Sequence, residues 1–213
     1  MTIFLDIALL LVVILLLMAV MLIIAKRIPK RLSNTQKNWW LIAHIMFVAI
    51  YLSGLFSTLL LTSITTTIVI DREHIHAAHL FGKYCDWFLI IPGAFGSLIT
   101  GIWLAVRTNW GLTKFRWIMV KTFGHIGAIL YGATLMRIWF DQTVALSLLT
   151  QSNFLNNPAY LYNRHMLIIG TIISLAILIF LVIISVFKPW GKLKNNLEPQ
   201  NKISLEYTVQ GKV

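Results

Sequence analysis

The sequence predicts an all-α integral membrane protein: a helical bundle of five transmembrane helices, with a four-helix core and an N-terminal anchor helix. Of its 213 residues, 58% are hydrophobic and 12% are charged, which is about half the charged fraction of a soluble domain. The apolar residues form five blocks, each close to the ~20 residues that cross a bilayer as a helix. We divide the chain into an anchor helix with a basic loop (1–37), a four-helix membrane core (38–190) and a polar cytoplasmic tail (191–213).

The first span runs from Ile7 to Ala25 without a single polar side chain, and five basic residues follow it by position 37. A cleaved signal peptide carries its positive charges before the apolar run and a small-residue cleavage site after it. Neither feature is present, so we expect a retained helix. It has no ladder of small residues for close packing, which predicts a peripheral position.

The second and third spans run from about Trp39 to Thr62 and from about His79 to Val106. A polar, histidine-rich loop connects them. Pro92, near the middle of the third span, lacks a backbone N–H and predicts a kink there.

The fourth span runs from Trp117 to about Phe140, and the fifth ends at about Phe187. Asn157 and Pro158 have the residue types of a helix N-cap and first helical position. They predict where the fifth helix begins.

The basic residues predict the topology. Five follow the first span, three lie between the third and fourth spans, and five follow the fifth, whereas the other side holds four. Because cytoplasmic loops are enriched in Lys and Arg, we expect an outside N-terminus and a cytoplasmic C-terminus in a bacterial plasma membrane. This topology also accounts for the net charge of +11, so we expect no nucleic-acid partner. The single cysteine excludes an internal disulfide.

Small residues predict how the spans pack, because membrane helices associate where their backbones approach closely. One ladder at spacing four lies in the third span and another in the fourth, and we expect the two to face each other. A stripe along the second span is expected to face inward. The first ladder is Gly93, Ser97 and Gly101, the second is Gly124, Ala128 and Gly132, and the stripe is His44, Phe47, Tyr51, Gly54 and Thr58.

Three ionisable residues lie within the apolar spans: His44, Lys121 and His125. An ionisable group at membrane depth costs about 2.5–3.5 kcal/mol on insertion scales and is functional by default. Lys121 and His125 are four residues apart and share a helix face. His44 lies about 8 Å into its own helix, at a depth similar to the ~6 Å of Lys121 and ~12 Å of His125.

The three residues predict a haem b site, because imidazole ligates haem iron and facing helices can hold a flat macrocycle. Small residues at Gly54, Gly124 and Ala128 would leave room for it, and its propionates would lean toward Lys37, Lys114 and Arg116. The alternative is that Lys121 snorkels to the headgroups and both histidines form ordinary buried hydrogen bonds. We find no paired carboxylates within the spans, and a lack of embedded acids weakens a proton-coupled transporter.

A second candidate site lies in the polar connection after the second span. Glu73, His76 and His79 follow one another at spacing three, with His74 nearby. On an early-starting helix they share a face and could bind zinc or copper. The alternative is a solvated, polar entry to a membrane helix.

Short motifs in spans two to four resemble a superfamily that includes the HemJ-type protoporphyrinogen oxidases, the CopD-type copper-resistance membrane domains and several uncharacterised membrane families. The motifs are Trp40-Leu41-Ile42-Ala43-His44 with Ser53-Gly54-Leu55-Phe56, then Pro92-Gly93 with Gly101, then Trp117-Ile118-Met119-Val120-Lys121. The resemblance implies that His44 and Lys121 are the functional pair, associated with haem b. The Pro-Arg and Tyr-His pairs of the oxidases are absent from Thr58 to Thr67, which favours a sister family over the oxidases themselves.

The leading functional hypothesis is a haem b-associated redox or haem-handling protein, in which His44 and Lys121 act as ligands or as a proton-handling pair. Oxidation of a porphyrinogen would also need an electron acceptor such as a quinone. The first alternative is a copper or other metal-handling membrane protein that uses the outer histidines. The second is a cofactor-free accessory subunit. The sequence leaves open whether the protein is an enzyme and is compatible with a homo-oligomer.

Overall fold

The computed structural model describes residues 2–28, 30–67, 71–148 and 154–191, and within them the chain is helical apart from short connections. The proposed tail (191–213) lies outside the described residues, except for Gly191. The elements follow one another as α1 (Thr2–Arg27), α2 (Asn34–Thr67), α3 (Arg72–Cys85), η1 (Asp86–Ile90), α4 (Ile91–Arg107), α5 (Arg116–Tyr131), η2 (Gly132–Met136), α6 (Arg137–Ser147), η3 (Phe154–Asn156) and α7 (Pro158–Phe187).

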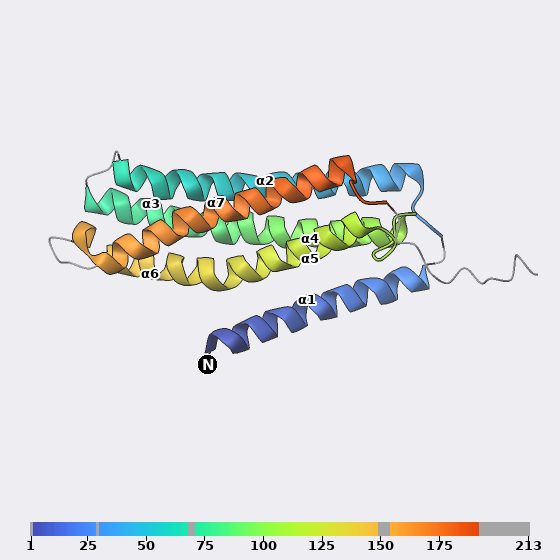
Figure 1. Ribbon diagram of the computed structural model, residues 1–213, viewed down its shortest axis with the longest axis horizontal. Coiled ribbons are helices and arrows are strands. Elements are labelled where there is room, and N and C mark those ends of the chain that lie inside the picture. The colour runs from blue at the N-terminus through green and yellow to red at the C-terminus, as the bar shows by residue number, and fades with distance from the viewer. Residues whose placement is uncertain (1, 29, 68–70, 149–153, 192–213) are drawn as a thin grey trace, which may run out of the picture.

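Within the described residues, five helical segments are long and apolar enough to cross a membrane, which matches the predicted number of apolar spans. Two are composite: α3, η1 and α4 form one segment, and α5, η2 and α6 form another. These two segments, α2 and α7 lie alongside one another as a bundle, with α1 on its outside (Figure 1). We call the end at which α1, α4 and α7 finish the basic end, because Arg27, Arg107 and Lys188 lie there.

Local sequence signals set the helix starts. Ser33 and Gln36 form a reciprocal capping box before α2: the Gln36 amide donates to Ser33 Oγ (3.2 Å) and the Ser33 amide to Gln36 Oε1 (3.1 Å). Asn157 caps α7 as predicted, since its Oδ1 accepts a hydrogen bond from the Ala159 amide at 2.9 Å.

The π-helical turn η1 stands where Pro92 was expected to disturb the third span. Proline provides no N–H and its ring crowds the carbonyl four residues earlier. The turn before it widens, and the Ile91 amide donates to the Asp86 carbonyl, five residues back. The perturbation is therefore absorbed as a π-turn within one continuous helical segment.

The small-residue ladders of α4 and α5 do not face each other, contrary to the prediction. The α4 glycines pack against α2 instead: a Cβ atom at Gly93 would lie 2.5 Å from the Tyr51 backbone nitrogen, and one at Gly101 would meet the His44 ring at 3.2 Å. In α5, Gly124 faces Leu181 of α7. Spacing along one helix identifies a close-packing face but does not identify the helix that occupies it.

The anchor helix α1 occupies the predicted peripheral position, and most of its surface is exposed. It is fixed mainly at the basic end, where the buried Arg107 guanidinium donates to the carbonyls of Ala25 (3.3 Å), Ile28 (2.6 Å) and Lys30. These bonds satisfy carbonyl groups that the end of a helix leaves without partners. Further along, Ile14 is 1% exposed and packs into the core.

Candidate functional site

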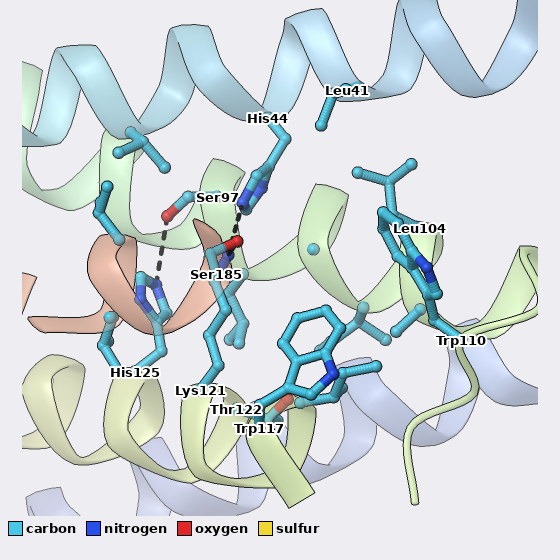
Figure 2. A pocket seen from close by; sticks show the side chains of 18 of the residues that line it. Leu41, His44, Ser97, Leu104, Trp110, Trp117, Lys121, Thr122, His125 and Ser185 are labelled. Atoms are coloured by element: carbon cyan, nitrogen blue, oxygen red, sulfur yellow. Dashed lines mark hydrogen bonds between the residues drawn. The ribbon is translucent and has the colours of Figure 1, made fainter. Parts of the chain in front are cut away.

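A cavity of about 360 Å³ lies between α2, α4, α5 and α7 near the basic end. Apolar side chains form most of its wall. The described lining residues include no Asp or Glu, so the charged groups facing it are all basic. Its polar and aromatic lining residues are Lys37, His44, Ser97, Trp110, Trp117, Lys121, Thr122, His125, Ser185 and Lys188 (Figure 2).

His44 projects from α2 into this cavity with a defined ring orientation. The Thr100 hydroxyl donates to the Gly96 carbonyl at 2.7 Å, so its oxygen accepts from His44 Nδ1 at 2.9 Å. With the proton on Nδ1, the lone pair of Nε2 faces the cavity. This arrangement is the one that orients an imidazole to bind a metal or to accept a proton.

Lys121 points into the bundle and not toward the end of its helix. Its Nζ lies 3.4 Å from His44 Nε2 and donates to Ser185 Oγ of α7 at 3.1 Å. The structure therefore brings together His44 and Lys121, from helices 77 positions apart in sequence. The sequence was compatible with either orientation of Lys121, snorkelling to the headgroups or pointing inward. In the structure its amine lies in the cavity.

His125 faces the same cavity but is engaged in the bundle wall. Its Nε2 donates to the Ala94 carbonyl at 2.9 Å and lies 3.2 Å from Ser97 Oγ, as Figure 2 shows for Ser97. The ring also meets Tyr51 edge-on, with centroids 6.1 Å apart. These contacts give His125 a role in joining α5 to α4, as in the structural alternative described above.

Two lysines and two tryptophans form the mouth of the cavity. Lys37 Nζ and Lys188 Nζ each lie 5.7 Å from the Trp110 ring centroid, and Lys188 Nζ lies 6.0 Å from that of Trp117. A cation at such a distance above an aromatic face is attracted to the ring. The mouth is thus both cationic and aromatic.

Two groups of residues expected around the haem do not line the basic-end cavity. Lys114 and Arg116 are exposed and do not line the cavity, and Lys188 stands beside Lys37 instead. The small residues also serve other purposes, since Gly54 packs against η1 and Gly124 against α7, while the third, Ala128, lines a different cavity. Lys188 could have been found from the sequence, because it ends a span on the same side as Lys37.

The outer residues Glu73, His76 and His79 share helix α3, which does begin early, but they turn to different partners. His76 Nδ1 pairs with Ser147 Oγ at 2.8 Å and the buried His79 Nε2 with Tyr160 OH at 2.9 Å, whereas Glu73 is exposed. Within the described residues, no three His, Cys, Asp or Glu side chains gather as a metal site.

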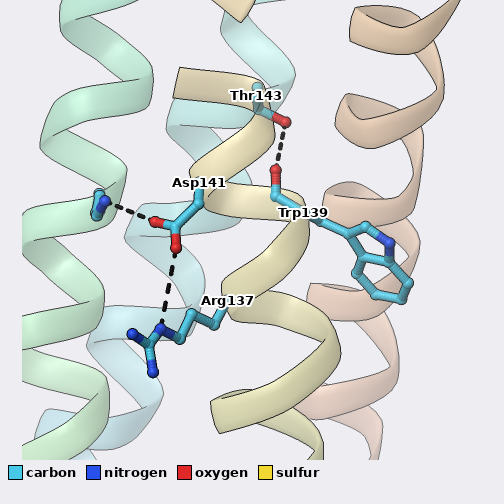
Figure 3. Close-up of polar contacts among 5 residues, drawn as sticks. Arg137, Trp139, Asp141 and Thr143 are labelled. Carbon is cyan, nitrogen blue, oxygen red and sulfur yellow. Dashed lines mark hydrogen bonds and ion pairs between the residues drawn. The ribbon is translucent and has the colours of Figure 1, made fainter. Parts of the chain in front are cut away.

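Four acidic residues lie within the apolar helical segments, although the spans were expected to lack embedded acids. Asp6 and Glu73 lie close to segment ends, whereas Asp86 and Asp141 lie further in. Asp86 belongs to η1 and Asp141 to α6. Asp141 accepts from Lys83 Nζ at 2.6 Å and lies 3.9 Å from Arg137 Nε (Figure 3). Asp86 was not predicted, because it stands between apolar neighbours at the far end of its span.

Comparisons with protein-family models, curated proteins and solved structures find no match to this chain. The resemblance to the HemJ and CopD group therefore stays a hypothesis that rests on its short motifs.

Proposed function

We propose that the protein is a five-span protein of a bacterial plasma membrane, with its basic end at the cytoplasmic face and its N-terminus outside. Five helical segments of sufficient length and apolarity support this placement. The helix ends at Arg27, Arg107 and Lys188 gather basic residues at one end, and Lys and Arg are enriched on the cytoplasmic side of membrane proteins.

We further propose that the basic-end cavity binds an anionic tetrapyrrole, with haem b as the leading candidate, in a haem-handling or haem-dependent redox role. One observation carries this proposal: the unprotonated Nε2 of His44 faces the basic-end cavity. The described lining of this cavity contains no acidic residue, and Lys37, Lys121 and Lys188 also line it. Imidazole is a haem ligand, and lysines at the mouth suit the propionates.

The residues fit this group in part. Lys121 Nζ contacts His44 Nε2 directly at 3.4 Å, so the amine would have to leave this position before the imidazole nitrogen could hold a metal. The volume of about 360 Å³ is near the small end of ligand sites. The arrangement supports His44 as the single ligand, with Lys121 swinging aside on its flexible chain.

In this proposal each residue has a separate task. Thr100 holds the His44 ring, His44 supplies the ligand nitrogen, and Lys121 donates a hydrogen bond or carries a proton between the cavity and Ser185. Lys37 and Lys188 hold carboxylates near the headgroups. Bound haem would supply one-electron chemistry at its iron; the apolar wall of the cavity would exclude water.

The copper-handling alternative gains no support from the arrangement of the outer histidines, because His76 and His79 have separate partners. A cofactor-free accessory role is the outcome to expect if no tetrapyrrole binds.

The test is the visible absorption spectrum, oxidised and dithionite-reduced, of detergent-purified protein from haem-replete cells. We expect a Soret band with sharp reduced bands, lost in His44→Ala and altered in Lys121→Ala. His165→Ala is the matched control, because His165 is an exposed histidine of α7 that does not line the cavity. A featureless spectrum of the folded wild type, also after addition of haemin, would refute the tetrapyrrole proposal.

A further inference from the structure

A second cavity, of about 420 Å³, lies between α1, α2 and the two composite helical segments. We call it the α1-side cavity, because Leu10 of α1 contributes to its wall. Most of its lining is apolar or aromatic, and it includes Phe95, Ile129 and Phe140. It adjoins the basic-end cavity, since Tyr51 and Ala94 line it and contact His125.

One end of the α1-side cavity carries all of its charged groups: Lys83, Asp86, Arg137 and Asp141. Lys83 pairs with Asp141 at 2.6 Å, and Arg137 lies on the other side of the same carboxylate (Figure 3). The side-chain carboxylate of Asp86 forms no hydrogen bond or ion pair within the described residues. Two cations thus balance two carboxylates, and one carboxylate keeps its acceptor capacity for a ligand.

The depth of Asp86 places this polar end at a membrane boundary. Asp86 precedes Arg107 by 21 residues, or about 31 Å of helix, which matches the ~30 Å thickness of the hydrocarbon core. Arg137 follows Arg116 by the same 21 residues. With the basic end at the cytoplasmic face, the charged groups lie at the opposite headgroup level and the apolar wall lies within the hydrocarbon.

We propose that the α1-side cavity binds a neutral, flat, membrane-dissolved molecule that carries hydroxyl or carbonyl groups on its ring, which is the chemistry of a quinol and its quinone. Asp86 accepts a hydrogen bond from a ring hydroxyl, and Arg137 donates to a ring oxygen. The proposal rests on the membrane location proposed above but does not depend on tetrapyrrole binding.

The ligand class follows from charge and shape. A ring fits because Tyr51, Trp87, Phe95 and Phe140 supply aromatic faces around the cavity. An anion would meet Asp86 and a cation would meet Arg137, so the balanced charges favour a neutral molecule. The basic-end cavity differs on this point, because its charged lining is entirely basic.

The test uses the full chain in lipid nanodiscs and a decyl benzoquinone that carries an azido group. We expect saturable photolabelling of peptides from η1, α4 or η2, displaced by the unlabelled quinol and quinone. Asp86→Asn should weaken displacement by the quinol about tenfold, because it removes a charge-assisted hydrogen bond, and should leave displacement by the quinone nearly unchanged.

A matched pair of glycine variants tests the location. Gly132 lines the cavity and an added Cβ atom there meets nothing within 4 Å, so Gly132→Leu should fill the cavity and abolish saturable labelling. Gly127 has equally open surroundings but does not line the cavity, so Gly127→Leu should label as the wild type. Labelling that is non-saturable, or equal in both leucine variants, would show that only lipid chains enter and would overturn the proposal. The haem spectrum of the same preparation reports on the other cavity separately.

Discussion

At the scale of single residues, Lys188 combines a backbone cost with a position at the mouth of the basic-end cavity. It ends α7 in the left-handed region, with φ 48° and ψ 52°, and its amide donates to the Ile184 carbonyl at 2.9 Å. This conformation costs an L-residue about 1–2 kcal/mol relative to the right-handed helix. Glycine adopts it freely, so the lysine side chain is retained there at the expense of stability.

Lys188→Gly should therefore raise stability and weaken ligand binding at the same time. We expect an increase of about 1 kcal/mol in the free energy of unfolding and a lower affinity for haemin or another anionic tetrapyrrole. Thermal unfolding in detergent and a haemin titration measure the two effects. Lys188→Arg keeps the charge and should keep the affinity. A less stable glycine variant would contradict the interpretation of this cap.

Thr100→Val tests whether the hydroxyl orients His44. Valine keeps the shape of threonine but removes the acceptor for Nδ1, and loss of such a partner typically lowers metal affinity about 10–100-fold. Thr134→Val is the matched control, because the Thr134 hydroxyl also donates to the carbonyl four residues earlier and, within the described residues, forms no hydrogen bond with a histidine. A haemin titration compares the affinities of the two variants. Equal affinities would show that Thr100 does not orient His44 for ligand binding.

At the scale of the elements, the contact between α2 and α4 depends on the absence of a side chain at Gly93. A Cβ atom there would lie 2.5 Å from the Tyr51 backbone nitrogen and 2.7 Å from its Cα atom. Backbone atoms cannot move aside as a flexible side chain does. The two helices would have to separate.

Gly93→Ala and Gly127→Ala should consequently change stability in opposite directions. Gly93→Ala should destabilise by about 1–3 kcal/mol through overpacking. Gly127→Ala should be neutral or stabilising by up to about 1 kcal/mol, because alanine favours the helix and the added methyl group meets nothing within 4 Å. Unfolding temperatures from size-exclusion chromatography of heated samples compare the two. Similar behaviour of both variants would refute the role given to Gly93.

The same elements show what the sequence can and cannot predict. Apolar blocks and capping residues predicted the five spans, since these signals are local. The depth and spacing of His44, Lys121 and His125 predicted that they face one space. Three features depend on contacts between distant segments: the helix that packs on Gly93, the Thr100 partner of His44, and the charged end of the α1-side cavity. No local pattern encodes those contacts.

At the scale of the whole molecule, the bundle is longer than a bilayer is thick. The segment Arg72–Arg107 has 36 residues, or about 54 Å, against a hydrocarbon core of about 30 Å. The predicted third span began at about His79 and not at Arg72, because the first turns of α3 are too polar to predict a membrane-spanning helix. The N-terminus of α1 lies well short of the far end of the bundle (Figure 1), so the outer turns of the core helices project beyond the part that α1 accompanies.

The proposed orientation is tested by labelling single cysteines with a membrane-impermeant maleimide in intact cells. In a Cys85→Ser background, Asn156→Cys should react from outside, because Asn156 is exposed and lies just before the start of α7, which finishes at the basic end. Lys114→Cys, exposed at the basic end, should react only after lysis. The reverse pattern would invert the topology, and equal reaction of both in intact cells would argue against membrane insertion.

The anchoring of α1 by Arg107 also has a consequence for biogenesis. Arg107 follows Ala25, whose carbonyl it binds, by 82 residues, and a ribosome needs about 4–16 s to add them. In the proposed membrane placement, α1 would have to be stable in lipid by itself during that interval, which the uninterrupted apolar run from Ile7 to Ala25 would allow. Under that placement, helix α1 would therefore enter the membrane as an independent unit, and its docking would wait until α4 has been synthesised and inserted.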